Sequence, residues 1–260
     1  MSFDSITGVT SLPDDFDGLV RLFPLPGMVL FPHAMQPLHV FEPRYVDMLQ
    51  EALSTDHLIT MATLTNQQGN VAIDEATKQK LPLNMLPPIS PTVCVGKIIS
   101  HAELEGDRHN ILIVGIRRAT VRHELETGRS FRTARVDLID DFYLPAGTQK
   151  RADLKKRLLE AFGKIIPVSE GSQKSLHDLM AGQMGVGPIT DIIAYTLPFD
   201  PNEKIKLLAM SDVDERAEAL IRLIKKGGLD LQSVSVEEGD VDLAESSRSR
   251  KDFPPPFSVN

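Results

Sequence analysis

Residues 22–45, LFPLPGMVLFPHAMQPLHVFEPRY, form the stretch of sequence that decides the fold. Short apolar runs alternate here with prolines, so the stretch is too broken for one helix and too apolar for a surface loop. Proline lacks the N–H that a β ladder needs, and it biases the preceding residue toward extended geometry. We therefore expect edge strands and corners at Leu22–Phe23, Val29–Phe31 and Leu38–Phe41.

A helix is expected directly after this stretch. Pro43 can open a helix at a position where its missing N–H costs nothing. Tyr45, Leu49 and Leu53 then recur at fourfold spacing, with Met48 beside them. This spacing gives the helix one apolar face, which we expect to pack on the core.

The next third of the chain has the patterns of β-strands. Residues 57–64, HLITMATL, are rich in apolar and β-branched residues and indicate a buried strand. Gly106 and Gly128 mark turns that need a positive φ. Three strands are expected around them, at Val93–Glu105, Asn110–Val121 and Phe131–Asp140. The nearly continuous apolar centre of the middle segment predicts the central strand of an antiparallel meander.

The apolar period changes from two to about 3.6 beyond residue 148. A proline, a glycine and small polar residues within 143–148 predict a hinge between two subdomains. Helices are expected over about 151–166, from Ser175 to Gly182, from Gly187–Pro188 to Thr196, from the Asp200 cap into 204–210, and from Ser211–Asp212 to Gly227.

Several short motifs have a specific spacing. They are Phe23-Pro24-Leu25 with Pro26, Phe31-Pro32, Pro37-Leu38, Phe41-Glu42-Pro43-Arg44-Tyr45, Gly96-Lys97-Ile98, Ile113 to Arg118, and the helical segments 197–199, 206–208 and 216–220. Over about residues 19–227 they resemble the N-terminal, substrate-binding domain family of Lon proteases. The resemblance implies an α+β fold, in which a PUA-like six-stranded antiparallel β pseudo-barrel is followed by a C-terminal helical bundle.

We expect four parts along the chain. They are a flexible N-terminal arm at 1–18, a PUA-like β-barrel subdomain at 19–142, a helical bundle subdomain at 148–228, and a disordered acidic and proline-rich tail at 229–260. The tail carries too little apolar surface to offset the entropy cost of ordering it. The arm is polar and contains Pro and Asp, so it is expected to be loosely held.

Composition argues against several function classes. The formal net charge of −8 disfavours a nucleic-acid partner held by a basic field. The single cysteine, Cys94, rules out an intramolecular disulfide and fits a reducing compartment. The chain shows neither a secretion signal nor an apolar run of about 18 residues that would suggest a membrane span. A cytoplasmic location without membrane contact is therefore expected.

The sequence contains none of the common catalytic motifs. Gly96-Lys97 and Gly163-Lys164 lack the upstream glycine and the hydroxyl residue of a phosphate-binding loop, and the chain has no G-x-S-x-G elbow. The seven histidines lack zinc-ligand spacing; a shared metal site at His33 and His39 is the alternative to ordinary surface histidines, which we favour. Residues 182–187, GQMGVG, follow a helix and are read as an interhelical loop. We expect no catalytic residue, metal or cofactor.

Two groups of charged residues allow two readings each. Arg44 beside Phe41 and Tyr45 can grip a peptide carboxylate, or it can tie the helix to the barrel while Glu42 favours the helix start. Arg117 and Arg118 can face a nucleic acid, or they can be solvated or ion-paired. In both groups we favour the structural role.

Exposed apolar loops are the best remaining functional signal. The candidate partner-binding residues are Met28, Phe31, Met35, Phe41, Arg44, Tyr45, Met85, Leu86 and Met184. The resemblance implies a non-enzymatic module that recognises unfolded or degron-bearing polypeptides, as an adaptor or regulator of a protease, with self-association as a weak homo-oligomer. The alternative is a PUA-like protein that binds a small molecule or RNA in the cleft between barrel and helices.

Overall fold

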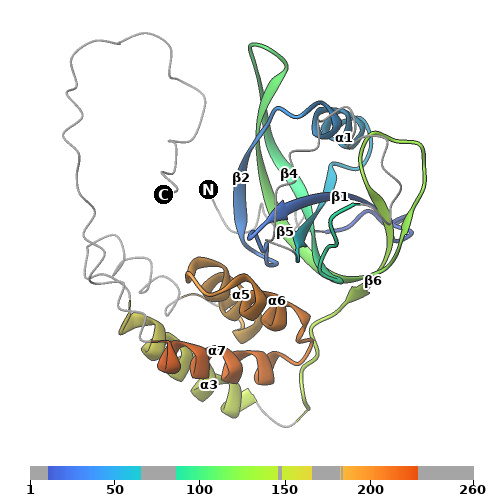
Figure 1. Ribbon diagram of the computed structural model, residues 1–260. Helices are drawn as coiled ribbons and strands as arrows, with labels where there is room; N and C mark the ends of the chain where they lie inside the picture. The colour runs from blue at the N-terminus through green and yellow to red at the C-terminus, as the bar shows by residue number, and fades with distance from the viewer. Residues whose placement is uncertain (1–10, 66–85, 146–147, 166–181, 183, 228–260) are drawn as a thin grey trace, which may run out of the picture.

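The computed structural model describes residues 11–65, 86–145, 148–165, 182 and 184–227. Strands occupy the first half and helices the second (Figure 1). The strands are β1 (Leu19–Pro26), β2 (Met35–Val40), β3 (Leu58–Leu64), β4 (Thr92–Leu104), β5 (Arg108–Leu125) and β6 (Thr133–Ile139). The helices are α1 (Pro43–Leu53), α3 (Thr148–Gly163), α5 (Val186–Thr196), α6 (Pro201–Ala209) and α7 (Val213–Lys226).

The strands form one six-stranded sheet in the order β2-β5-β4-β3-β1-β6. β5 also pairs with β6, so the sheet curls back on itself, and β5 contacts three strands as its apolar centre predicts (Figure 1). The α+β class is confirmed. The expected purely antiparallel pairing is wrong at one place, because β1 and β3 run parallel. Their connection through β2 and α1 is long enough to cross over, as a parallel pair requires.

The prolines lie where the sheet has a free side. β1 pairs with β6 only over Leu19–Arg21, so Pro24 and Pro26 lie where β1 is paired with β3 alone. β2 pairs with β5 on one side and carries Pro37 at the sheet edge. The edge positions expected from proline are therefore confirmed for β2 and for the second half of β1.

Val29–Phe31 is not a strand, contrary to the sequence prediction. These residues form a buried loop that crosses the sheet. The loop is fixed to β5 by two backbone hydrogen bonds, from His33 N–H to the Gly115 carbonyl (2.8 Å) and from Gly115 N–H to the Ala34 carbonyl (2.9 Å). An added Cβ at Gly115 would lie 2.1 Å from the Phe31 carbonyl oxygen, so only glycine fits beneath the loop.

The main hydrophobic core runs from α1 through the sheet into the helices. It contains Met48 and Leu49 of α1, Ile113 of β5, and Leu158 and Ile193 of the helical part. In Figure 1, α5 and α6 lie next to the sheet, and α3 and α7 cover their far side. Among the described residues, no helix is long and apolar enough to cross a membrane.

Local signals for turns and caps are confirmed. Gly106 and Gly128 have positive φ angles of 76° and 70°. The side chain of Asp200 accepts a hydrogen bond from the N–H of Asn202, and Asp212 caps α7 in the same way.

Cys94 is a buried core residue, and burial raises the pKa of its thiol. Apart from Gly182, the helix expected from Ser175 lies outside the described residues.

Residues 11–18 are held against the sheet. Leu12 and Phe16 pack on a second apolar cluster inside the curl of the sheet. The side chain of Asp17 accepts a hydrogen bond from the N–H of Leu19, and its carbonyl accepts one from Arg135 at 2.7 Å. This differs from the loose arm expected over 1–18. Residues 1–10 and the tail expected at 229–260 lie outside the described residues.

Replacement of Gly115 by alanine is expected to lower the free energy of unfolding by about 3 kcal/mol or more, because the new Cβ collides with the backbone of the crossing loop. Chemical denaturation measures this loss. Gly128→Ala is the matched control, since an added Cβ there meets nothing within 4 Å and only its positive φ opposes it. That control should cost about 1 kcal/mol. Equal losses in the two variants would contradict the role assigned to Gly115.

Candidate functional site

An apolar, aromatic surface follows the edge strand β2. Met35, Pro37 and His39 alternate with buried or partly buried residues and point outward. Phe41 directly follows the strand, and its ring lies 5.7 Å from the ring of His39. The side chain of Met35 is 57% exposed and that of Phe41 is 60% exposed. We call these four residues the β2 face.

The backbone edge of β2 is partly closed to a further strand. The Gly115 N–H donates to the Ala34 carbonyl. The backbone N–H and C=O groups of the even-numbered residues of β2 therefore point toward β5, and those of the odd-numbered residues point away from it. On the outward side, the Met35 carbonyl accepts from the Tyr195 hydroxyl (3.1 Å), and the Pro37 carbonyl accepts from the Gln36 side chain (2.8 Å). Pro37 has no N–H to offer. Three backbone positions on the outward side of β2 are therefore unavailable for hydrogen bonds to an added strand. The β2 face favours contact through side chains instead.

The helical part braces this edge. Tyr195 of α5 donates its hydroxyl to the Gln36 side chain as well, at 2.5 Å. The ammonium of Lys204, on α6, donates to the Tyr195 carbonyl at 2.7 Å and lies 5.8 Å from the centre of the tyrosine ring. Burial lowers the pKa of Lys204 to about 8. The position of β2 thus depends on where α5 and α6 sit.

Two predicted partner-binding residues belong to the core instead. Phe31 is a fully buried residue of the crossing loop, and Tyr45 is buried with its ring 4.4 Å from that of Phe23. The prediction that they lie on an exposed surface is wrong, because the stretch folds inward around them. Met28 and Met184 are partly buried against the core. Met85 lies outside the described residues.

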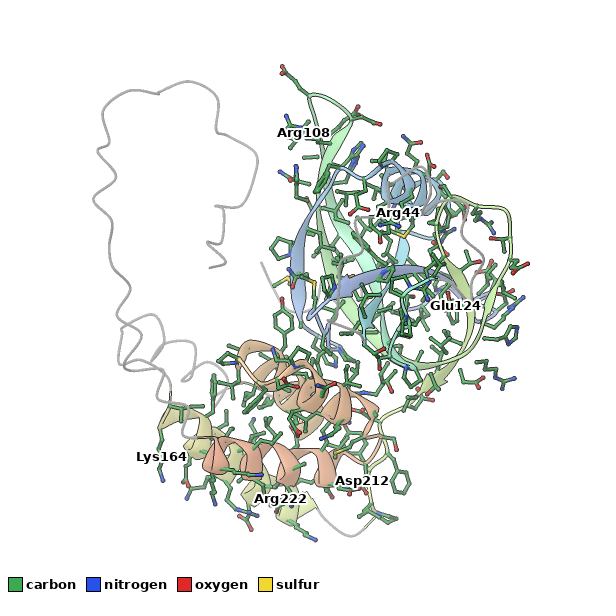
Figure 2. The ribbon with its side chains drawn as sticks, viewed as in Figure 1. Arg44, Arg108, Glu124, Lys164, Asp212 and Arg222 are labelled. Carbon is green, nitrogen blue, oxygen red and sulfur yellow. The ribbon has the colours of Figure 1, made fainter. Side chains whose placement is uncertain are left out.

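Arg44 is engaged locally on α1 (Figure 2). Its guanidinium forms an ion pair with Glu42 at 2.6 Å and lies 4.6 Å from the centre of the Tyr45 ring. These contacts fit a structural role for Arg44 at the start of α1. The tie from the helix to the barrel, which was favoured from the sequence, stays a prediction.

Leu86 lines a cavity of about 390 Å³ together with Ile89, Val121, Glu124 and Arg132. Arg132 donates to both carboxylate oxygens of Glu124 and to the Pro87 carbonyl, so its charge is neutralised within the wall. Residues 66–85, which precede Leu86, lie outside the described residues.

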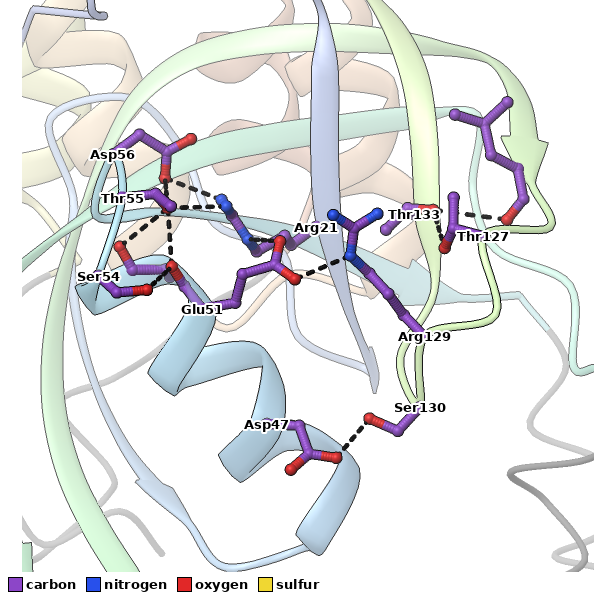
Figure 3. Close-up of polar contacts among 12 residues, drawn as sticks. Arg21, Asp47, Glu51, Ser54, Thr55, Asp56, Thr127, Arg129, Ser130 and Thr133 are labelled. Carbon is purple, nitrogen blue, oxygen red and sulfur yellow. Dashed lines mark hydrogen bonds and ion pairs between the residues drawn. The ribbon is translucent and has the colours of Figure 1, made fainter.

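A second cavity, of about 470 Å³, lies between β1, the end of α1 and the β5–β6 turn. Figure 3 shows its polar wall, where Arg21 donates to Glu51, Asp56 and Thr55 and where Arg129 donates to the other oxygen of Glu51. The paired guanidinium groups lower the pKa of Glu51 against the opposing effect of desolvation, which is the larger single influence. The cluster joins three elements and serves as a structural brace.

The junction between sheet and helices contains a buried charge quartet: Arg118, Asp141, Asp191 and Arg216. Arg118 of β5 pairs with Asp141, which follows β6, and with Asp191 of α5 at 2.6 Å. Arg216 of α7 binds the same two carboxylates, at 3.0 Å to Asp141 and 3.2 Å to Asp191. The two arginines also donate to the carbonyls of Leu208 and Met210 at the end of α6. Two cations therefore face two anions. Arg118, Asp191 and Arg216 are buried, whereas the side chain of Asp141 is 21% exposed.

Burial is the main influence on Asp191. It raises the pKa of this carboxyl to about 6, although Arg118 and Arg216 favour the ionised form. The structural reading of Arg118 holds, since it is ion-paired and buried, while Arg117 is exposed.

The predicted hinge at 143–148 is preceded by a residue that is held by backbone hydrogen bonds. Phe142 N–H donates to the Ser211 carbonyl, and Val213 N–H donates back to Phe142.

Sequence reasoning missed the partners in the quartet. Asp191 lies within the apolar helix sequence ITDIIAYT, and Arg216 lies on the buried face of α7. A charged residue at an apolar position of a helical period was the available signal, since such residues are rarely buried unless they are paired.

His33 and His39 do not converge on a common partner: His39 bonds to Asn110, and His33 contacts Gly115 through its backbone.

Removal of one member of the quartet should be costly. Asp191→Leu leaves two buried guanidinium groups facing one carboxylate and is expected to lower the free energy of unfolding by about 3–5 kcal/mol. Adding Arg118→Met to that variant should cost less than the sum of the single losses. Chemical denaturation of the four species in this cycle measures the coupling.

The exposed pair Arg122 and Asp137 is the control for that cycle. Arg122→Met and its cycle with Asp137→Leu should change stability little, because solvent screens the pair. Strict additivity at Arg118 and Asp191 would show that the quartet does not act as a unit.

The family model for the ATP-dependent protease La (LON) substrate-binding domain matches residues 20–226. The chain is 25% identical over 209 residues to Lon protease 1 of Bacillus subtilis and 23% identical over 205 residues to the Lon protease of Haemophilus influenzae. These matches cover 79% and 78% of this chain and 24% of each protease, so the chain spans about a quarter of the length of these relatives.

Solved structures agree on the fold. The N-terminal domain of a Lon protease from the Mycobacterium avium complex superposes with a TM-score of 0.58 at 14% identity, covering 80% of this chain and 98% of that one. A Lon N-terminal domain protein from Xanthomonas campestris gives 0.50 at 19% identity, covering 78% and 97%. The fold and the match over residues 20–226 lead to one conclusion: the chain belongs to the family of ATP-dependent protease La (LON) substrate-binding domains.

Proposed function

We propose that this protein recognises unfolded polypeptide segments through the β2 face, without catalysing a reaction. The observation that carries the proposal is the exposure of Met35 and Phe41 in one row with Pro37 and His39 on a braced edge strand. Large apolar side chains exposed in a row are typical of surfaces that contact other proteins. The matched family is the Lon substrate-binding domain, which supports the same class of function.

The physical character of the β2 face suits clients of varied sequence. Met35 has a flexible, polarizable side chain that adapts to different partners, and Phe41 offers a large apolar area. The partly closed backbone edge of β2 disfavours the addition of a client strand. Affinity then depends on apolar side chains of the client, which an unfolded chain exposes and a folded one hides.

The alternative site, a cleft between barrel and helices, has less support. That junction is filled by the charge quartet and by core residues such as Leu207 and Val213. The two cavities described above lie on the β part, and their arginines are neutralised by neighbouring carboxylates. Binding of RNA or a small anion would need positive charge that these walls do not offer.

The finer roles rest on the same proposal. A module that holds unfolded segments suits an adaptor or regulator that delivers clients to a protease in the cytoplasm. Self-association through the apolar β2 face is a further consequence, because two copies can cover each other's exposed side chains.

The binding proposal predicts that Met35→Ser with Phe41→Ser weakens binding of reduced, unfolded casein about tenfold or more, because the apolar contacts are lost. Fluorescence anisotropy of labelled casein measures the affinity. Binding by the unchanged chain should fall little between low and moderate salt, since the contacts are apolar.

Phe142→Ser is the matched control, because Phe142 is 52% exposed but lies in the segment between β6 and α3. This variant should bind casein as the unchanged chain does. Equal binding by all variants, or salt-sensitive binding of an RNA oligonucleotide in place of casein, would refute the proposed function.

A further inference from the structure

The sequence contains a segment whose chemistry matches the β2 face. Residues 253–257 read Phe-Pro-Pro-Pro-Phe, and they follow a basic run of Arg248, Arg250 and Lys251. We propose that residues 248–257 of the tail bind the β2 face of the same chain and compete there with polypeptide clients. This inference rests on the proposed function for its regulatory meaning, whereas the contact itself is testable alone.

The backbone chemistry of the two partners is complementary. Three backbone positions of the β2 edge cannot bond to an added segment. The Met35 and Pro37 carbonyls already accept hydrogen bonds, and Pro37 has no N–H. Pro254, Pro255 and Pro256 have no N–H, so the segment gives up no backbone donor by lying along an edge that offers few ladder hydrogen bonds. Proline-rich segments dock on aromatic and apolar surfaces at low entropic cost, because they are already extended.

The spacing of side chains also agrees. In a polyproline II segment, residues four apart such as Phe253 and Phe257 are separated by about 12 Å. Outward residues four apart on a β-strand, such as Pro37 and Phe41, are separated by about 13 Å. The spacing therefore lets one phenylalanine lie near Phe41 and the other near Pro37. Because polyproline II has three residues per turn, the two side chains point in directions about 120° apart around the segment axis.

Charge fixes the direction. The tip of the β4–β5 hairpin lies beyond the Phe41 end of β2, as Arg108 marks in Figure 2, since Val40 pairs with His109. The tip exposes Glu103, Glu105 and Asp107 against the single Arg108. A tail whose basic run precedes Phe253 can place Arg248, Arg250 and Lys251 beside these carboxylates, with Phe253 near Phe41.

The connection is long enough. Residues 227–252 separate the end of α7 from Phe253, and a chain of that length spans at most roughly 80 Å when extended. A folded chain of about this size is only about 45 Å across. Binding within one chain also raises the local concentration of the tail to about the millimolar range, so a weak contact suffices.

Methyl NMR of the full chain labelled at methionine tests the contact directly. The variant Phe253→Ser with Phe257→Ser should move the Met35 methyl resonance, which is assigned by its loss in Met35→Leu. The matched control Val234→Ser with Val236→Ser removes two apolar tail residues outside the motif and should leave the resonance in place. A synthetic peptide of residues 246–260, added to the Phe253→Ser, Phe257→Ser chain, should return it. An unchanged Met35 resonance in all spectra would overturn the inference.

A second readout separates this inference from the proposed function. Casein should bind the Phe253→Ser, Phe257→Ser chain several-fold more tightly than the unchanged chain, because the competing segment is lost. If the Met35 resonance stays fixed while casein binding still depends on Met35 and Phe41, the tail contact is refuted and the proposed function stands. If the resonance moves but casein does not bind, the tail contact stands and the proposed function is refuted.

Discussion

The buried charge quartet is the interaction on which the arrangement of this molecule depends. Arg118 and Arg216 come from the sheet and from α7, and each binds both Asp141 and Asp191. Charged groups are expensive to bury, so such a set is stable only in the one arrangement that pairs all its members. Apolar packing alone would tolerate small shifts of the helices on the sheet. The quartet selects one position and thereby defines the relation between the two halves.

The candidate binding surface depends on that position. α5 carries both Asp191 and Tyr195, so the helix that enters the quartet also supplies the hydroxyl that closes the β2 edge. The contact of Tyr195 with Gln36 then connects the edge strand to the helical part. A single helix therefore links a charge network in the interior to an apolar surface on the outside. The β2 face is rigid at its backbone and adaptable at Met35.

Local chemistry made much of the fold predictable. The turns at Gly106 and Gly128 and the caps at Asp200 and Asp212 follow from single residues whose preferences do not depend on distant contacts. Features set by distant contacts were not predictable. Val29–Phe31 is extended and apolar like a strand, but its partner is the backbone of β5 beneath it. The quartet unites residues up to 98 positions apart in sequence, and no local pattern joins them.

The candidate site was predictable only in part, for a related reason. Met35, Phe31 and Phe41 look alike in sequence, because all three are large apolar residues near prolines. Their exposure is decided by which side of β2 or of the crossing loop they occupy. Alternation along β2 would have separated Met35 from its neighbours once the strand register was known. Register is a property of the pairing with β5, which the single sequence does not contain.

The most direct test of the account is a hydroxyl-radical footprint of the chain with and without saturating reduced casein, in the Phe253→Ser, Phe257→Ser background. This measurement reads the solvent access of individual methionine, histidine and aromatic side chains. The account predicts protection of Met35, His39 and Phe41, with Phe142 and Tyr143, which are also exposed, unchanged. Protection confined to Phe142 and Tyr143, or to the cavity residue Phe16, would contradict it.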